Sequence, residues 1–274
     1  MIYVVRQYTS MQSKIPVIAA VVVVLVIIVA GTYVVTKSDS QDDERYGIVG
    51  AMEEEVKIFL KEIDETECRK IGDIEFHIGT LGGKNVVVAE CGYGKVNAGI
   101  CVQLMITEFN VTSVINSGVA GTLDPRVGIG NIVVSTDTVQ HDYDMHEIGF
   151  EHGLIPNVNK ISIKADDKLR EVAVEAISKV SSETEVFEGR ICTGDQFISG
   201  IDEMMPIVEA FGGLCCEMEG GAVAQVCYLN NVPFVIIRAI SDNINGEGPE
   251  DYSKFEKEMA DKCAKMTIEM LKAI

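Results

Sequence analysis

The sequence is poor in basic residues for its length and lacks repeats and low-complexity tracts. It holds 23 Lys and Arg against 42 Asp and Glu in 274 residues, which gives a formal net charge of −19. Such a negative potential repels phosphate polyanions, so nucleic-acid binding is disfavoured. Intrinsic disorder is disfavoured as well, because 47% of the residues are hydrophobic. The chain is therefore expected to fold around a full apolar core.

Several motifs of common enzyme classes are missing. There is no G-x-S-x-G elbow, which weakens a serine hydrolase hypothesis, and the cysteines show no C-x-x-C or Cys/His ligand spacing. The turn Gly92–Lys95 follows an apolar run, but the third glycine of a dinucleotide motif would fall on Asn97 and the first of a P-loop on Ala89. We interpret this segment as a tight strand-to-helix turn and expect no cofactor.

One histidine-rich segment is a weak candidate for metal binding. His141–His146 reads HDYDMH, and on a strand Asp142, Asp144 and His146 would share a face. The other two histidines, His77 and His152, have no supporting acidic pattern in the sequence. Polar loop residues are the simpler interpretation, and we expect no metal site.

The first 37 residues contain no carboxylate and include a long apolar run. Residues 15–35 have no charged side chain and, at about 1.5 Å per residue, are long enough to cross a hydrocarbon core of about 30 Å. We predict a cytoplasmic stub at 1–14, a transmembrane or signal-anchor helix at 15–35, a linker at 36–45 and a folded domain at 46–274.

The charges beside this run favour one orientation. Arg6 and Lys14 precede it, whereas acidic residues follow Lys37, so the domain is expected outside the cytoplasm. Secretion after signal cleavage is the alternative. Five of the cysteines lie in apolar runs and indicate buried thiols of a reduced, cytoplasm-like domain, which leaves the compartment open: Cys91, Cys101, Cys192, Cys216 and Cys227.

Strand-like and helix-like stretches alternate after the linker. Continuous apolar runs such as Val86–Val88 and Val235–Ile237 are typical of strands buried on both faces, so we predict one three-layer α/β/α domain around a mixed, twisted central sheet. The loop at 141–161 is a candidate active-site or interface segment. The predicted strands are 46–50, 74–80, 85–90, 113–116, 131–135, 187–192, 214–216 and 233–239, and the predicted helices 53–63, 96–109, 167–180, 202–210, 220–229 and 252–273.

Three acidic elements stand at the ends of apolar strands. They are the carboxylate triplet Glu53–Glu55, the stretch Glu217–Glu219, and Asp242. Ligands of open α/β sheets collect beyond the carboxyl ends of strands, so these elements can converge on one pocket. Each also has a structural explanation, because carboxylates in a first helical turn complement the helix dipole and Asp242 can open a turn.

Five ordered blocks resemble one enzyme family: GIVGAMEEEV at 47–56, SGVAGT at 117–122, TGDQFISG at 193–200, CEMEGGAVAQV at 216–226 and VPFVIIRAISD at 232–242. The chain is similar to 5′-methylthioadenosine/S-adenosylhomocysteine nucleosidases of the purine nucleoside phosphorylase and uridine phosphorylase superfamily. The resemblance implies hydrolysis of an N-glycosidic bond by water, with a small nucleoside as substrate and no cofactor. It also implies a homodimer.

The resemblance implies a role for each residue of the blocks. Asp242 matches the general acid that protonates adenine, Glu55 the base that polarises water, and Glu219 the residue that holds the ribose. The other implied site residues surround adenine, ribose or water: Met218, Phe197, Ile198, Ser241, Arg238, Glu217, Ala120 and Gly121. Three positions depart from the family pattern and concern substrate choice: Val119 in place of a small hydroxyl residue, Tyr93 in place of an aliphatic one, and Ile148 in place of an aromatic from the partner subunit.

Alternatives remain open at this point. An aminodeoxyfutalosine-type nucleosidase would share the base and the sugar and differ in the 5′ tail. A phosphate-dependent phosphorylase is disfavoured, because Glu53–Glu55 would repel phosphate. A surface nucleoside-binding protein without turnover is disfavoured by the presence of Glu55, Glu219 and Asp242 together.

Overall fold

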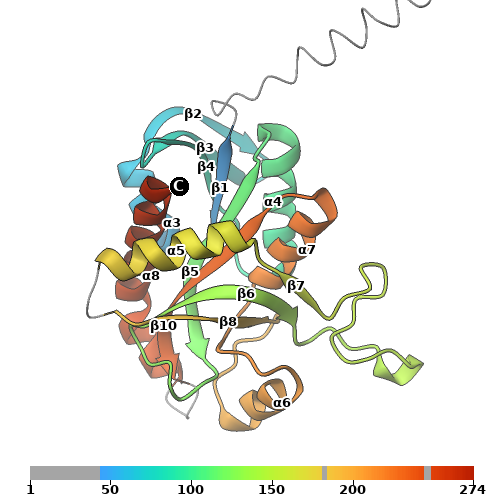
Figure 1. Ribbon diagram of the computed structural model, residues 1–274. Helices are drawn as coiled ribbons and strands as arrows, with labels where there is room; N and C mark the ends of the chain where they lie inside the picture. Colours follow the sequence, from blue (N-terminus) through green and yellow to red (C-terminus); the bar gives the residue numbers. More distant parts are fainter. Residues whose placement is uncertain (1–43, 181–183, 244–247) are drawn as a thin grey trace, which may run out of the picture. The chain divides into compact units, whose positions relative to one another are not determined.

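A mixed sheet forms the centre of the computed structural model, which describes residues 44–180, 184–243 and 248–274 (Figure 1). Part of this sheet closes into a ring, because β10 pairs with both β5 and β6, and β9 pairs with both β8 and β5. The remaining path runs from β5 through β1, β4 and β3 to β2. The strands are β1 (Arg45–Gly50), β2 (Asp64–Ile71), β3 (Ile74–Leu81), β4 (Lys84–Glu90), β5 (Ser113–Thr122), β6 (Ile132–Gln140), β7 (Ser162–Lys164), β8 (Val186–Thr193), β9 (Cys215–Glu217) and β10 (Phe234–Asn243).

Helices cover both faces of the sheet. Helices α4 (Lys95–Phe109) and α7 (Gly220–Asn230) pack into one apolar cluster, whereas α3 (Glu53–Glu62), α5 (Asp167–Val180) and α8 (Gly248–Ala273) pack into the other. Helix α6 (Ile201–Phe211) joins a third, smaller cluster. The predicted three-layer mixed α/β fold is thus confirmed, with the added feature that five strands close on themselves.

The central strands form where the sequence is continuously apolar. Val86–Val88 of β4 and Val235–Ile237 of β10 are fully buried, as expected for strands covered by helices on both sides. Strand β5 pairs in parallel with β1 and with β10, so the carboxyl ends of these three strands lie at one edge. That edge carries the acidic residues singled out in the sequence.

Two strands and several boundaries differ from the prediction. Strand β2 (DETECRKI) was not predicted, because it is charged and almost entirely exposed at the edge of the sheet. The short strand β7 was not predicted either. Strands β5, β6 and β10 continue past the predicted ends at 116, 135 and 239, and helix α8 begins before residue 252. Residues 141–161 are mostly irregular, with a short 3₁₀ turn η2 (His146–Ile148).

The predicted membrane segment at 15–35 lies outside the described residues. Within residues 44–180, 184–243 and 248–274, no helix has the length and apolarity needed to span a bilayer.

The five cysteines predicted to be buried are buried, and all eight cysteines are free thiols. The exposed one is Cys68 on β2.

Candidate active site

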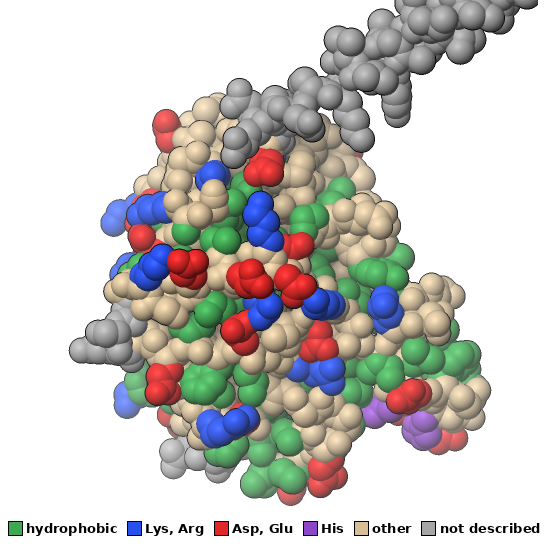
Figure 2. Space-filling model, in the orientation of Figure 1, with side chains coloured by type: hydrophobic (Ala, Val, Ile, Leu, Met, Phe, Trp, Pro, Cys, Tyr) green, Lys and Arg blue, Asp and Glu red, His purple; other side chains and the backbone are tan. Residues whose placement is uncertain are grey.

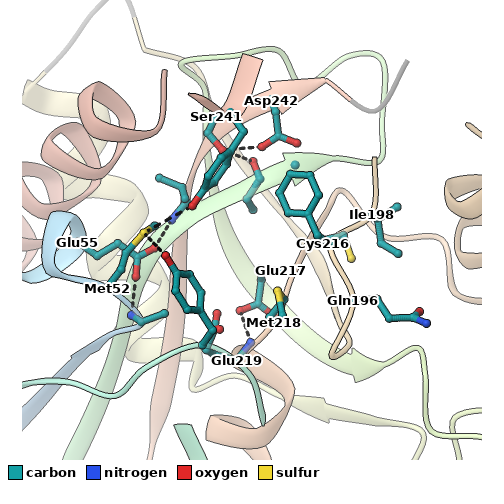
Figure 3. Close-up of a pocket in the computed structure, with 17 residues that line it drawn as sticks. Met52, Glu55, Gln196, Ile198, Cys216, Glu217, Met218, Glu219, Ser241 and Asp242 are labelled. Atoms are coloured by element: carbon teal, nitrogen blue, oxygen red, sulfur yellow. Dashed lines mark hydrogen bonds between the residues drawn. The ribbon is translucent and has the colours of Figure 1, made fainter. Parts of the chain in front are cut away.

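A pocket opens at the carboxyl ends of β1, β5 and β10 (Figure 3). Figure 3 shows Glu55, Glu219 and Asp242 approaching it from three different elements. These three residues, which we call the pocket carboxyls, are each at most 5% exposed. The pocket is lined by Ala51, Met52, Glu55, Tyr93, Val119, Ala120, Gly121, Gln196, Phe197, Ile198, Cys216, Glu217, Met218, Glu219, Ser241, Asp242 and Tyr252.

Glu55 is held at the first turn of α3 by two backbone donors. Its Oε2 accepts a hydrogen bond from the Ala51 N–H at 2.5 Å, and its Oε1 accepts one from the Val119 N–H at 2.9 Å. Burial raises the pKa of this carboxyl, while the nearby Arg238 guanidinium and the two N–H groups lower it. Glu53 and Glu54 of the same turn are more exposed and do not line the pocket.

Arg238 lies behind the pocket lining and connects the acidic groups. Its Nη2 donates to Asn116 Oδ1 at 2.6 Å and to the Glu217 carboxylate, and it lies 3.7 Å from Glu219 Oε2. Glu217 also accepts bonds from the Thr193 hydroxyl and the Gly220 N–H. A side chain at Gly118 would clash with both Glu55 and Arg238, so a glycine is needed where these two groups approach each other.

Glu219 immediately precedes α7, and its side chain binds the turn Gly92–Lys95 rather than the first turn of the helix. Its Oε1 accepts a hydrogen bond of 2.8 Å from the Gly94 N–H. Burial, followed by the charge of Glu217, raises the pKa of Glu219 to about 8, while Arg238 opposes this shift. The turn Gly92–Lys95 therefore helps to position Glu219 by donating a backbone hydrogen bond to its carboxyl group. Gly94 has φ of +90°, a conformation that favours glycine.

Asp242 is the last residue but one of β10 and lies across the pocket from Glu219 (Figure 3). Its Oδ1 accepts a 2.7 Å hydrogen bond from the Ser241 hydroxyl. Burial raises the pKa of Asp242 to about 6, while the serine bond lowers it. A carboxyl with this pKa still holds its proton in an appreciable fraction of molecules near neutral pH, as a general acid must.

The predicted binding residues lie around these carboxyls. Met218, Ile198, Val119, Ala120 and Gly121 line the pocket. Phe197 is 48% exposed at its rim and contacts the ring of Tyr252 edge-on, with centroids 5.4 Å apart. Ile148 lies on η2 and does not line the pocket of its own chain. The structure thus brings the implied residues together, apart from Arg238 behind the lining and Ile148.

Sequence reasoning missed Tyr252, together with Met52, Ala51, Gln196 and Cys216. Tyr252 belongs to α8, and its hydroxyl lies 3.6 Å from the Met52 sulfur. The Tyr93 hydroxyl lies 3.5 Å from the same sulfur, and the two tyrosine side chains interact. The hydroxyls of Tyr93 and Tyr252 thus lie together at the pocket. The two residues are far apart in the sequence, so the sequence alone does not indicate that they are neighbours.

The histidine-rich loop forms local pairs rather than one cluster. Asp142 accepts a 2.6 Å bond from Lys95, whereas Asp144 binds the His146 ring at 2.7 Å. The loop between β6 and β7 protrudes from the domain in Figure 1, and Figure 2 shows histidines beside acidic side chains on this protrusion. The segment is not a strand, so the shared face considered for Asp142, Asp144 and His146 does not form.

His77 has acidic neighbours in the folded chain that no pattern in the sequence indicates. Its Nδ1 lies 2.6 Å from the Glu65 carboxylate, and Glu75 is also close. The pairing of β2 with β3 creates this neighbourhood.

Comparisons with known proteins agree with this geometry. The sequence pattern of the family described as "Phosphorylase superfamily" matches residues 45–274. The 5′-methylthioadenosine/S-adenosylhomocysteine nucleosidase of Shewanella oneidensis is 42% identical over 212 residues, 77% of this chain and 89% of that protein. The corresponding enzyme of Neisseria meningitidis, solved in complex with methylthio-immucillin-A, has a TM-score of 0.81 and 32% identity, covering 84% of this chain and 100% of that one. The native futalosine hydrolase of Helicobacter pylori has the same TM-score and identity, covering 86% and 100%.

Proposed function

This chain belongs to the 5′-methylthioadenosine/S-adenosylhomocysteine nucleosidase family of the phosphorylase superfamily, and we propose that it hydrolyses the N-glycosidic bond of 5′-methylthioadenosine and S-adenosylhomocysteine. The products are adenine and the 5-substituted ribose. The observation that carries this proposal is the convergence of Glu55, Glu219 and Asp242 on one buried pocket. Their distinct surroundings suit the three tasks of the reaction.

Asp242 is proposed to protonate the leaving adenine. Cleavage produces a base that is a poor leaving group as an anion, so a proton must be supplied at a ring nitrogen. Burial gives Asp242 a pKa of about 6, and the neighbouring Ser241 hydroxyl fixes its orientation. Phe197 and Ile198, on the rim and wall of the pocket, are placed to hold the base.

Glu55 is proposed to activate the attacking water, and Glu219 is proposed to hold the sugar. Glu219, whose Oε1 accepts a hydrogen bond from the Gly94 N–H, is placed to bind the ribose hydroxyls as the bond to the base breaks. Glu55 is anchored through both carboxylate oxygens, so it is fixed in position to accept a proton from water. Arg238, bound to Glu217 and close to Glu219, is proposed to orient these groups from behind.

Hydrolysis is favoured over phosphorolysis by the charge of the pocket. Among the residues that the structure describes, its lining includes four carboxyl groups and no Lys or Arg. A phosphate co-substrate needs cationic groups or free backbone donors, and here the N–H groups of Ala51 and Val119 are already bound by Glu55. The attacking group that fits is therefore neutral water.

The test is release of adenine by the full-length chain with and without phosphate. We expect release from methylthioadenosine and adenosylhomocysteine in phosphate-free buffer, whereas an absolute phosphate requirement would establish a phosphorylase. Parallel assays with an aminodeoxyfutalosine substrate test whether the chain prefers that 5′ tail.

Glu55→Gln separates turnover from binding. It should lower kcat by about 100-fold or more, whereas Glu53→Gln, its matched control in the same helical turn, should stay near the wild-type rate. Equal rates for the two variants would remove Glu55 from the mechanism.

We also infer a homodimer. Val96 and Ile100 lie one turn apart on α4 and are 71% and 51% exposed, and the neighbouring α7 exposes Leu229. A second copy would cover this apolar surface, and the exposed Ile148 would be available to the partner's pocket. Sedimentation should give a dimer for the wild-type chain and a larger monomer fraction for Val96→Asp.

The location of the domain is a separate proposal. The uncharged run at 15–35 and the basic residues before it support a membrane anchor with the nucleosidase domain outside the cytoplasm, with secretion after cleavage as the alternative. Protease added to intact cells should degrade an external domain. Full protection of the domain would place it inside.

A further inference from the structure

A second group of reactive side chains lies on the β2–β3 hairpin, away from the pocket. We call Glu65, Cys68, Glu75 and His77 the hairpin cluster. The Cys68 sulfur, a Glu75 carboxylate oxygen and a ring nitrogen of His77 lie within 4.8 Å of one another. Cys68 and His77 are directly paired across the two antiparallel strands, and Glu75 precedes His77 by two residues, so all three share one face.

The His77 ring is held in a form suited to metal binding. Its Nδ1 lies 2.6 Å from the Glu65 carboxylate, which in the neutral ring accepts the Nδ1 proton and leaves the Nε2 lone pair free. Carboxylates commonly orient metal-binding histidines in this way. The His77 side chain is 20% exposed, so the ring is fixed and still accessible to a small ion.

The surroundings are negatively charged. His77 and Glu75 line a surface hollow together with Asp73 and Glu90, and none of its lining residues within the described part of the chain is Lys or Arg. Lys70 lies 3.7 Å from Glu75, but both side chains are more than half exposed, which makes this ion pair weak. A cation is therefore favoured at this place, and a small one can reach all three potential ligands.

We propose that Cys68, Glu75 and His77 bind a divalent transition-metal ion of the zinc class, with Glu65 orienting the histidine. Sulfur, nitrogen and oxygen ligands together suit zinc or cobalt, whereas magnesium and calcium prefer oxygen ligands alone. Three protein ligands leave a fourth tetrahedral position for water. Because Cys68 lies on the edge strand β2 and His77 and Glu75 on β3, the ion would clamp the outer hairpin and stabilise it.

Cobalt titration tests this proposal independently of nucleosidase activity. The full-length chain is freed of metal with a chelator, the chelator is removed, and cobalt(II) chloride is added. We expect a thiolate-to-cobalt charge-transfer band and tetrahedral visible bands that saturate at a single equivalent and disappear when zinc is added. Absence of these bands at saturating cobalt would overturn the proposal.

Two variants test the assigned roles of Cys68 and Glu65, and a third is their control. Cys68→Ser should abolish the charge-transfer band, and Glu65→Gln should keep the band but weaken the affinity by about 10- to 100-fold. Glu67→Gln is the matched control on β2, since Glu67 pairs with Ile78 and lies off the shared face. A band that persists in Cys68→Ser, or an equal loss of affinity in Glu67→Gln, would refute the assignment. Circular dichroism confirms that each variant folds.

Discussion

The pocket carboxyls and the hairpin cluster are both acidic groupings brought together by strand pairing, yet they differ in burial. Glu55, Glu219 and Asp242 are almost fully buried, and burial is the first cause of the raised pKa of each. Glu65 and Glu75 of the hairpin cluster are exposed. Carboxyl groups of the same domain are therefore buried in the pocket and exposed to water on the hairpin.

This difference separates proton chemistry from ion binding. A buried carboxyl retains its proton to higher pH, so it can donate the proton or accept one at neutral pH. The exposed carboxyl groups of the hairpin cluster lie beside a thiol and an imidazole, where they can attract or bind a cation. Changing one residue in each region should therefore affect different measurements.

The largest effect is expected for Asp242→Asn. Asparagine keeps the size and the hydrogen-bonding oxygen but cannot donate the acidic proton, so kcat for adenine release should fall by about 100- to 10,000-fold. Asp202→Asn, an exposed change in the first turn of α6, is the control and should retain the wild-type rate. A wild-type rate in Asp242→Asn would show that the buried carboxyl is not the acid.

The same variant should change the pH dependence of stability. The folded-state pKa of Asp242 is about 6 against an ordinary value of 3.8, so the wild-type chain loses stability as the pH rises through this interval. Asn carries no such cost, and Asp242→Asn should be more stable than wild type by about 3 kcal/mol above about pH 7 and equal to it below about pH 3. Denaturant unfolding at several pH values measures this. A constant difference would contradict the raised pKa.

A smaller effect is expected at the border of the pocket. Tyr93→Phe and Tyr252→Phe each remove one hydroxyl beside the Met52 sulfur. If these hydroxyls face the 5′ tail, kcat/KM for adenosylhomocysteine should fall relative to methylthioadenosine by about 2- to 10-fold, the value of one hydrogen bond. Tyr228→Phe on α7 is the control. An equal effect on both substrates would place the tyrosines away from the tail.

Much of the fold and of the pocket could be predicted from the sequence. The apolar runs Val86–Val88 and Val235–Ile237 identify β4 and β10, because strands that are buried on both faces consist largely of apolar residues. Glu55 and Asp242 could be predicted because Glu55 lies in the first helical turn after β1 and Asp242 near the carboxyl end of β10, and these parallel strands end at one edge.

The hairpin and the border of the pocket could not be predicted, for a physical reason. Strand β2 is exposed and charged, so no alternation of apolar residues marks it. The approach of Glu65 to His77 depends on a register shift between Glu65 and Glu67 that no local pattern encodes. Tyr252 reaches Phe197 only through the packing of α8, which is a tertiary contact.

The smallest effect is expected for Glu75→Gln in the metal-free chain. Glu75 is exposed and its pair with Lys70 is long, so the free energy of unfolding should change by no more than about 0.5 kcal/mol. With zinc present, the wild-type chain should gain stability that the variant lacks, because an ion that binds only the folded state stabilises it. If zinc raised the free energy of unfolding equally in both chains, Glu75 would not be a ligand. If Glu75→Gln strongly destabilised the metal-free chain, exposure would not distinguish the hairpin cluster from the pocket carboxyls.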